Sequence, residues 1–222
     1  MIISEVISDF RILYDEKVAD DAAGLEDEEI RAYLDDSQFE LVESKFFGLP
    51  DNQRKISELR YLLGHSSLTA STGANLGGFD YYVDLPTGTT GFLYYWDSSS
   101  NVTRTNYPNV TGADFRNIYV GDENISVFSS YGFNVHFLEP RVGIRDDKLY
   151  LKGDSYTTLS TVDLEYIRKP TSIRDGATSL NVDLPDHLRG ELVIMAVTKA
   201  VGAMSDQNKY QISSAEQQKE SN

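Results

Sequence analysis

The sequence has no cysteine, and only three of its 222 residues are histidines. Without a thiol the chain cannot form a disulfide, a cysteine-ligated zinc or iron–sulfur site, or a cysteine nucleophile. The histidines are far apart and lack the two-histidine-plus-acid spacing of metal sites; they are His65, His136 and His187. We therefore expect no metal and no cofactor.

Positive charge is also scarce, with 20 Lys and Arg against 35 Asp and Glu and a net charge of −15. Proteins that grip nucleic acid do so through cations that displace counterions from phosphates. The longest cationic cluster here is Arg168-Lys169, so specific nucleic-acid binding is not expected.

Long apolar runs are missing as well. No stretch approaches the roughly 18 apolar residues of a membrane span, and acids interrupt the N-terminal residues 1–10, unlike a secretory signal. We expect a protein made in a cytoplasm, without a membrane partner. At 40% hydrophobic and 11% aromatic residues, the chain should fold around a substantial core.

The first third of the chain has helical spacing. Apolar residues from Ile3 to Tyr14 predict an amphipathic helix with Ser4 as its cap. A second helix is predicted from Glu26 through Phe46, because its first turn is acidic and Gly48 follows its end. A third is predicted over residues 52–63, closed by Gly64.

The middle of the chain has the composition of β structure. A Gly-, Ser- and Thr-rich linker is predicted at residues 66–78, followed by eight short strands in an antiparallel sandwich or small barrel. The segment Asp97-Ser-Ser-Ser-Asn101 is expected to be a turn. The strands are placed at 79–85, 91–97, 102–107, 117–120, 125–129, 133–138, 148–152 and 162–168.

The end of the chain returns to helical spacing. Pro170 ends the last strand, and a helix with many small residues is predicted over residues 187–204. The fold class is therefore α+β, with terminal helices in a bundle and a β insertion. The expected division is 1–65 (helical core), 66–160 (β insertion), 161–205 (strand and core helix) and 206–222 (a polar tail, frayed or ordered by a neighbour).

Motifs for catalysis are few. The glycines from Gly73 to Gly78 precede a predicted strand, whereas phosphate-binding loops precede a helix. Adjacent acids such as Asp35 and Asp36 usually stay solvated, and no nucleophile elbow occurs. We therefore expect a protein that is not an enzyme.

Aromatic residues gather in the first two predicted strands. Core packing is the ordinary explanation, but flat amphipathic rings also form sugar-stacking platforms and protein interfaces. Tyr81 and Tyr95 are the rings we expect to be exposed. A carbohydrate- or receptor-binding β module is therefore an alternative function, and a glycan hydrolase, which would need two carboxylates several ångströms apart, is a third.

The two ends of the chain resemble the head-to-tail connector, or neck adaptor, proteins of tailed bacteriophages. The resemblance lies in the helix EEIRAYLDDSQFELV from Glu28 to Val42, in LEYIRKP from Leu164 to Pro170, and in LPDHLRGEL from Leu184 to Leu192 with the helix that follows. The central region, about residues 66–160, looks like an enlarged insertion. The acidic character and lack of cysteine are similar to neck ring proteins of crAss-like short-tailed phages.

This resemblance implies a structural virion protein, with no catalytic site, that forms a ring of twelve-fold symmetry between portal and tail. Its partners would be copies of itself, the portal and neighbouring neck or tail proteins, and genomic DNA would pass through the ring without specific binding during ejection. A ring needs two different complementary surfaces on each subunit. The interface residues we expect are Tyr81, Tyr95, Arg168, Lys169, Tyr210 and Ile212.

Overall fold

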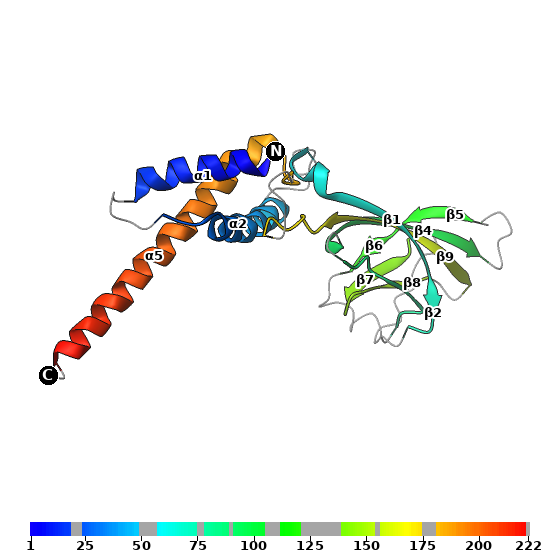
Figure 1. Cartoon of the computed structure of the whole chain (residues 1–222). Coiled ribbons are helices and arrows are strands. Elements are labelled where there is room, and N and C mark those ends of the chain that lie inside the picture. Colours follow the sequence, from blue (N-terminus) through cyan, green and yellow to red (C-terminus); the bar gives the residue numbers. More distant parts are fainter. Residues whose placement is uncertain are drawn as a thin grey trace. The chain divides into compact units, whose positions relative to one another are not determined.

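The computed structural model divides the chain into two compact units, a helical unit of residues 1–62 and 170–222 and a β unit of residues 63–169 (Figure 1). The α+β class is confirmed. The strand predicted at 162–168 belongs to the β unit, whereas the division expected from the sequence placed it in one segment with the C-terminal helix. The residues described are 1–18, 24–48, 57–74, 78–88, 91–104, 112–120, 139–153, 156–174 and 181–220, with side chains described through Met204.

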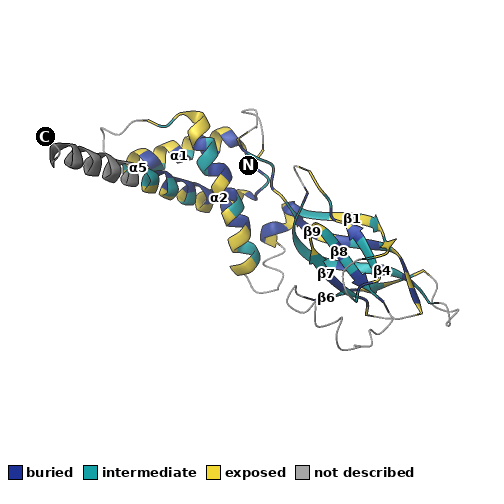
Figure 2. Cartoon of the chain, turned by 90° about the horizontal axis from the view of Figure 1, so that it is seen from below, coloured by how far each residue is buried: buried dark blue, intermediate teal, exposed yellow. Residues whose placement is uncertain are grey.

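Both ends of the chain build the helical unit. Its elements are α1 (Ile3–Lys17), α2 (Asp27–Gly48), η1 (Arg60–Leu62), η2 (Asp186–Leu188) and α5 (Arg189–Glu220). Helices α1 and α2 both contact α5, and the buried sides of all three helices are dark blue in Figure 2. Ala196 and Ala200 on α5 are fully buried, because small side chains permit close helix packing.

The acidic first turn predicted for α2 is present, whereas the capping residue predicted for α1 is not. Helix α2 begins with three acids, and the Glu26 N–H donates to Glu29 Oε2 at 3.0 Å, as in a capping box. The prediction that Ser4 caps α1 is wrong, because the capping position is Ile2 and no side chain caps the helix. Backbone pairing holds this end instead, with the Val182 N–H donating to the Met1 carbonyl at 2.9 Å.

The predicted third helix ends earlier than its apolar spacing indicates. Residues 51–56 lie outside the described part; the described portion ends in η1, and strand β1 (Leu63–Thr69) follows at once. Gly64 is therefore a strand residue and does not close a helix. A Cβ atom at Gly64 would lie 2.7 Å from the Tyr166 ring, so the glycine makes room for that ring.

The β unit contains two sheets around one core. One sheet has the strand order β1-β9-β4-β5 and the other β2-β3-β8-β7-β6, with every pairing antiparallel except β6 with β7. Residues of both sheets, including Val83, Leu149, Val162 and Leu164, form one hydrophobic cluster. The other strands are β2 (Ser71–Thr72), β3 (Tyr81–Asp84), β4 (Phe92–Arg104), β5 (Ala113–Arg116), β6 (Ile118–Tyr119), β7 (Arg141–Arg145), β8 (Lys148–Lys152) and β9 (Thr157–Arg168).

Two segments predicted as a loop and a turn are strands. Residues 66–69 and 71–72 of the expected linker at 66–78 lie in β1 and β2. Residues 97–101 lie inside β4, which merges two predicted strands. Ser98 and Ser100 can occupy a central strand because Asn117 satisfies them: its Nδ2 donates to Ser98 Oγ at 2.8 Å, and Ser100 Oγ donates to its Oδ1 at 2.7 Å.

Other strand predictions are confirmed. Strand β8 has the predicted bounds, and β9 buries Val162, Leu164 and Tyr166 on one face. Asp146 and Asp147, with φ of 50° and 59°, form the tight turn between β7 and β8. Strands β5 and β7 were not predicted, and the predicted strands at 125–129 and 133–138 lie outside the described residues.

Candidate interaction surfaces

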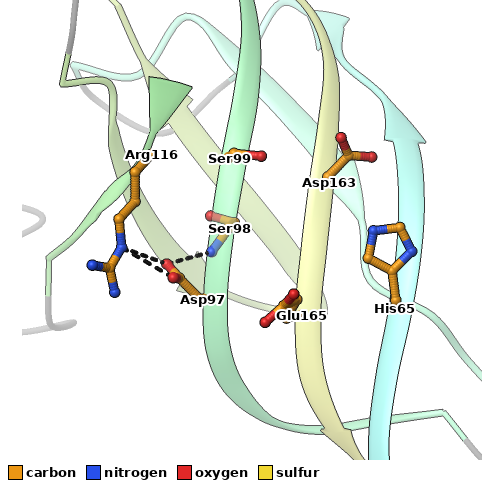
Figure 3. Close-up of a pocket in the computed structure, with 7 residues that line it drawn as sticks. All are labelled: His65, Asp97, Ser98, Ser99, Arg116, Asp163 and Glu165. Carbon is orange, nitrogen blue, oxygen red and sulfur yellow. Dashed lines mark hydrogen bonds and ion pairs between the residues drawn. The ribbon is translucent and has the colours of Figure 1, made fainter. Parts of the chain in front are cut away.

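A row of polar side chains crosses the four-stranded sheet. The register places His65 of β1 opposite Glu165 of β9, and Glu165 opposite Asp97 of β4. Side chains at paired positions project from the same face of a sheet. Together with Ser98, Ser99, Asp163 and Arg116 they line a hollow of about 410 Å³ (Figure 3).

The Asp97 carboxylate is the most constrained group in this row. Arg116 Nε lies 3.0 Å from its Oδ2, and the Ser98 backbone N–H donates to its Oδ1 at 2.8 Å. The hydrogen bond that Arg116 donates to Asp97 raises the pKa of Arg116, which therefore stays charged. Within the described ranges, no three His, Asp or Glu side chains gather in a way that could hold a metal ion.

An aromatic hollow of about 520 Å³ adjoins the polar row and shares Asp97 and Arg116 with it. The rings of Tyr95 and Tyr119 are stacked in its wall, with centroids 4.7 Å apart and planes 22° from parallel. Tyr119 is 45% exposed, so part of the stack is accessible to solvent. The remaining lining residues are Trp96, Asn117, Ile118 and Glu139.

A buried hydrogen-bond network holds Tyr95 in place. Its hydroxyl pairs with Ser98 Oγ at 3.0 Å, and Ser98 Oγ also accepts from Asn117. Desolvation raises the pKa of Tyr95 to about 12. The Tyr95 ring, which stacks on Tyr119, is therefore fixed in orientation, and its hydroxyl is uncharged at physiological pH.

The structure places Tyr81 and Tyr95 in β3 and β4, half-buried and packed against the β core. This corrects the expectation that both rings are exposed. Register shifts between Phe92 and Tyr94 and between Tyr95 and Asp97 interrupt the alternation of β4, so Phe92 and Tyr95 both pack against the core. The Tyr81 hydroxyl donates to the Thr157 carbonyl at 3.3 Å.

The other predicted interface residues lie at two further places. Arg168 is the last residue of β9, and Lys169 follows it. The Lys169 N–H donates to the Gly91 carbonyl at 2.9 Å, and its side chain is exposed. Tyr210 and Ile212 belong to α5, beyond the residues whose side chains are described. Tyr119 and Arg116 were not singled out from the sequence, because β5 and β6 are too short to show a periodic signal.

The helical unit holds most of the negative charge. It contains 23 Asp and Glu against 12 Lys and Arg, a net charge of −11 out of −15 for the chain. Some of these acids tie the unit together: Arg189 of α5 contacts Asp9 of α1 at 2.5 Å and Glu5 at 2.8 Å. The excess of uncompensated acids makes this unit repel polyanions.

No protein-family model and no curated protein sequence matches the chain. Within the residues that the structure describes, every helix is too short or too polar to cross a bilayer. The fold, the surface chemistry and the sequence resemblance are therefore the grounds for proposing a function.

Proposed function

We propose that this protein is a structural component of a phage particle that assembles as a ring, with twelve subunits expected, in the neck between portal and tail. One observation carries the proposal. Two of the three segments that resemble neck adaptors, Glu28 to Val42 and Leu184 to Leu192 with the helix that follows, are far apart in the sequence. They nevertheless lie in one helical unit, in which α2 contacts α5.

The shape of α5 supports an intersubunit role. In Figure 1 its last turns extend beyond α1 and α2. The sequence of residues 205–222 has few apolar residues, so this stretch contributes little to the core of its own subunit. A long helix with such a polar end can enlarge the contact with the next subunit of a ring.

The charge of the helical unit suits a channel for DNA. A surface with a net charge of −11 repels phosphates and lets DNA pass without being held. The exposed acids at the start of α2, Asp27, Glu28 and Glu29, are candidates for this lining. The partners proposed are the portal and the neighbouring neck or tail proteins, and the role requires no catalytic centre.

Native mass spectrometry and negative-stain images of the purified protein, alone and mixed with a portal protein, test the proposal. We expect a closed ring in at least one of these samples. A protein that remains monomeric with every candidate neighbour, or that turns over a small substrate, would contradict it.

Deletion of residues 205–222 gives a sharper test. The cut leaves Met204, whose Sδ accepts the hydroxyl of Tyr14 and joins α5 to α1. We expect weaker subunit association and a nearly unchanged melting temperature of the monomer, since the deleted stretch is polar. Ultracentrifugation measures association and calorimetry measures stability. A large fall in monomer stability would show that the segment belongs to the subunit core.

A further inference from the structure

We propose that the β unit also binds neutral oligosaccharides, in a groove formed by two adjoining hollows, one on the four-stranded sheet and one that Ile118 and Tyr119 of β6 also line. The sheet groove is defined by Tyr95, Asp97, Arg116, Tyr119 and Glu165. Its hollows, of about 410 and 520 Å³, have the size of small-ligand sites, roughly 300–1,000 Å³. This site is separate from the helical unit on which ring assembly was proposed.

The Tyr95–Tyr119 stack supplies a platform for a sugar ring. A pyranose has one face of C–H groups, which packs on an aromatic ring, while its hydroxyls remain at the edge for polar contacts. Tyr119 is 45% exposed and rests on Tyr95 at 4.7 Å. Tyr95 is itself locked by Ser98, so little side-chain freedom is lost when a ligand covers the stack.

The Asp97–Arg116 pair supplies directional polar contacts beside the platform. Asp97 engages the Nε of Arg116, while 80% of the Arg116 side chain remains exposed. A carboxylate accepts hydrogen bonds and a guanidinium donates several in one plane. Adjacent sugar hydroxyls both donate and accept, so this pair can bind two of them together, and Glu165 offers another acceptor along the row.

The charge of the groove selects against acidic sugars. Its lining contains Asp97, Glu139, Asp163 and Glu165, against the single guanidinium of Arg116 and one imidazole, His65. A uronic acid or a phosphorylated sugar would therefore be repelled. A cationic peptide would not be repelled and can also stack its cations on the tyrosines. We favour a neutral sugar chain because the Asp97–Arg116 pair places a hydrogen-bond acceptor and several donors side by side next to the stack, and hexalysine tests the other ligand class.

The test measures binding of the full-length protein to defined probes by isothermal titration calorimetry and saturation-transfer NMR. The probes are neutral hexasaccharides, namely cellohexaose, maltohexaose and chitohexaose, together with hexagalacturonate and hexalysine. We expect at least one neutral hexasaccharide to bind and hexagalacturonate not to bind. Binding of hexalysine alone, or of no neutral probe, would overturn the proposal.

Two substitutions locate the site. Tyr119→Ala removes the platform and Asp97→Asn removes the charged acceptor at constant size; each should weaken sugar binding by about tenfold or more. Tyr156→Ala is the matched control. Tyr156 is 52% exposed and lies just before the first residue of β9, at the end of that strand away from Glu165. Circular dichroism checks that each variant is folded. Equal binding by all three variants would overturn the assignment, whatever the oligomeric state of the protein.

Discussion

At the scale of single residues, Asp35 shows how one buried carboxylate organises a junction of the chain. Its Oδ1 accepts the Ile173 N–H at 2.7 Å and the Gln38 amide at 3.2 Å, and its Oδ2 accepts the Ser172 hydroxyl at 3.3 Å. The chain returns from the β unit at Pro170. Asp35 therefore fastens the first returning residues onto α2.

Replacement of this carboxylate should be costly. In Asp35→Ala the Ile173 N–H loses its acceptor while it remains buried, and we expect the free energy of unfolding to fall by about 2–3 kcal/mol in urea titrations. Asp36→Asn is the control: Asp36 is 56% exposed and pairs only with Arg174 among the described residues, so its loss should cost under about 1 kcal/mol. Equal losses would contradict this role of Asp35.

Tyr95 should make stability depend on pH in the alkaline range. Its pKa is near 10 in the unfolded chain and is raised to about 12 by burial. The stabilisation is therefore complete below pH 10 and is lost as the pH rises from 10 to 12, with a slope of up to about 1.4 kcal/mol per pH unit. Urea titrations across this range should show a shallower decline for Tyr95→Phe than for the parent protein.

The comparison needs a control because the chain has 14 tyrosines. Tyr156→Phe changes an exposed tyrosine of the same unit, so its alkaline decline should match that of the parent protein. A parallel decline in all three proteins would show that Tyr95 titrates normally.

At the scale of elements, the pairing of β1 with β9 depends on a glycine opposite an aromatic ring. Gly64 pairs with Tyr166, whose ring lies over the glycine and also contacts Phe92, with centroids 5.9 Å apart. A side chain at position 64 must displace this ring. The glycine therefore leaves the space that the Tyr166 ring occupies over β1.

Two glycine substitutions should have opposite effects. Gly64→Ala places a methyl 2.7 Å from the Tyr166 ring, and we expect a loss of about 1–3 kcal/mol of stability. Gly202→Ala lies in α5, with no atom of the described structure within 4 Å of the new methyl; it should stabilise the helix by up to about 1 kcal/mol. Thermal unfolding of both variants tests the pair, and a neutral Gly64→Ala would contradict the close approach.

At the scale of the whole molecule, the β unit is an insertion whose two ends meet. Leu63 at its start pairs with Ile167 near its end, and antiparallel partners lie about 5 Å apart. The cluster that includes Val162 and Leu164 belongs to the β unit alone. Contacts such as Lys45 with Glu191 at 2.7 Å and Lys199 with Glu40 at 2.8 Å belong to the helical unit.

The helical unit should therefore survive removal of the β unit. We expect a variant with residues 63–169 replaced by a short Gly/Ser linker to keep its helical circular dichroism and to unfold cooperatively, because insertion ends that lie close together can be joined without strain. Calorimetry of this variant and of the isolated segment 63–169 measures both units. Loss of cooperative unfolding in the linked variant would show that the helical core depends on the β unit.

The order of structural elements could be read from the sequence because it depends on local patterns. Apolar spacing predicted α1 and the first part of α5, the acidic first turn and Gly48 predicted α2, and local composition predicted a strand at 162–168, which lies within β9. The Asp146-Asp147 turn is also a local feature, since its two residues tolerate positive φ.

Long-range contacts decided the rest. The Ser-rich segment of β4 pairs with β9, and Asn117 satisfies its buried hydroxyls. Gly64 pairs with Tyr166 of β9, whose ring covers the glycine. The sheet groove likewise forms only where β1, β9 and β4 are in register and Tyr119 meets Tyr95. Local spacing cannot predict such contacts, because each one joins residues that come together only in the folded chain.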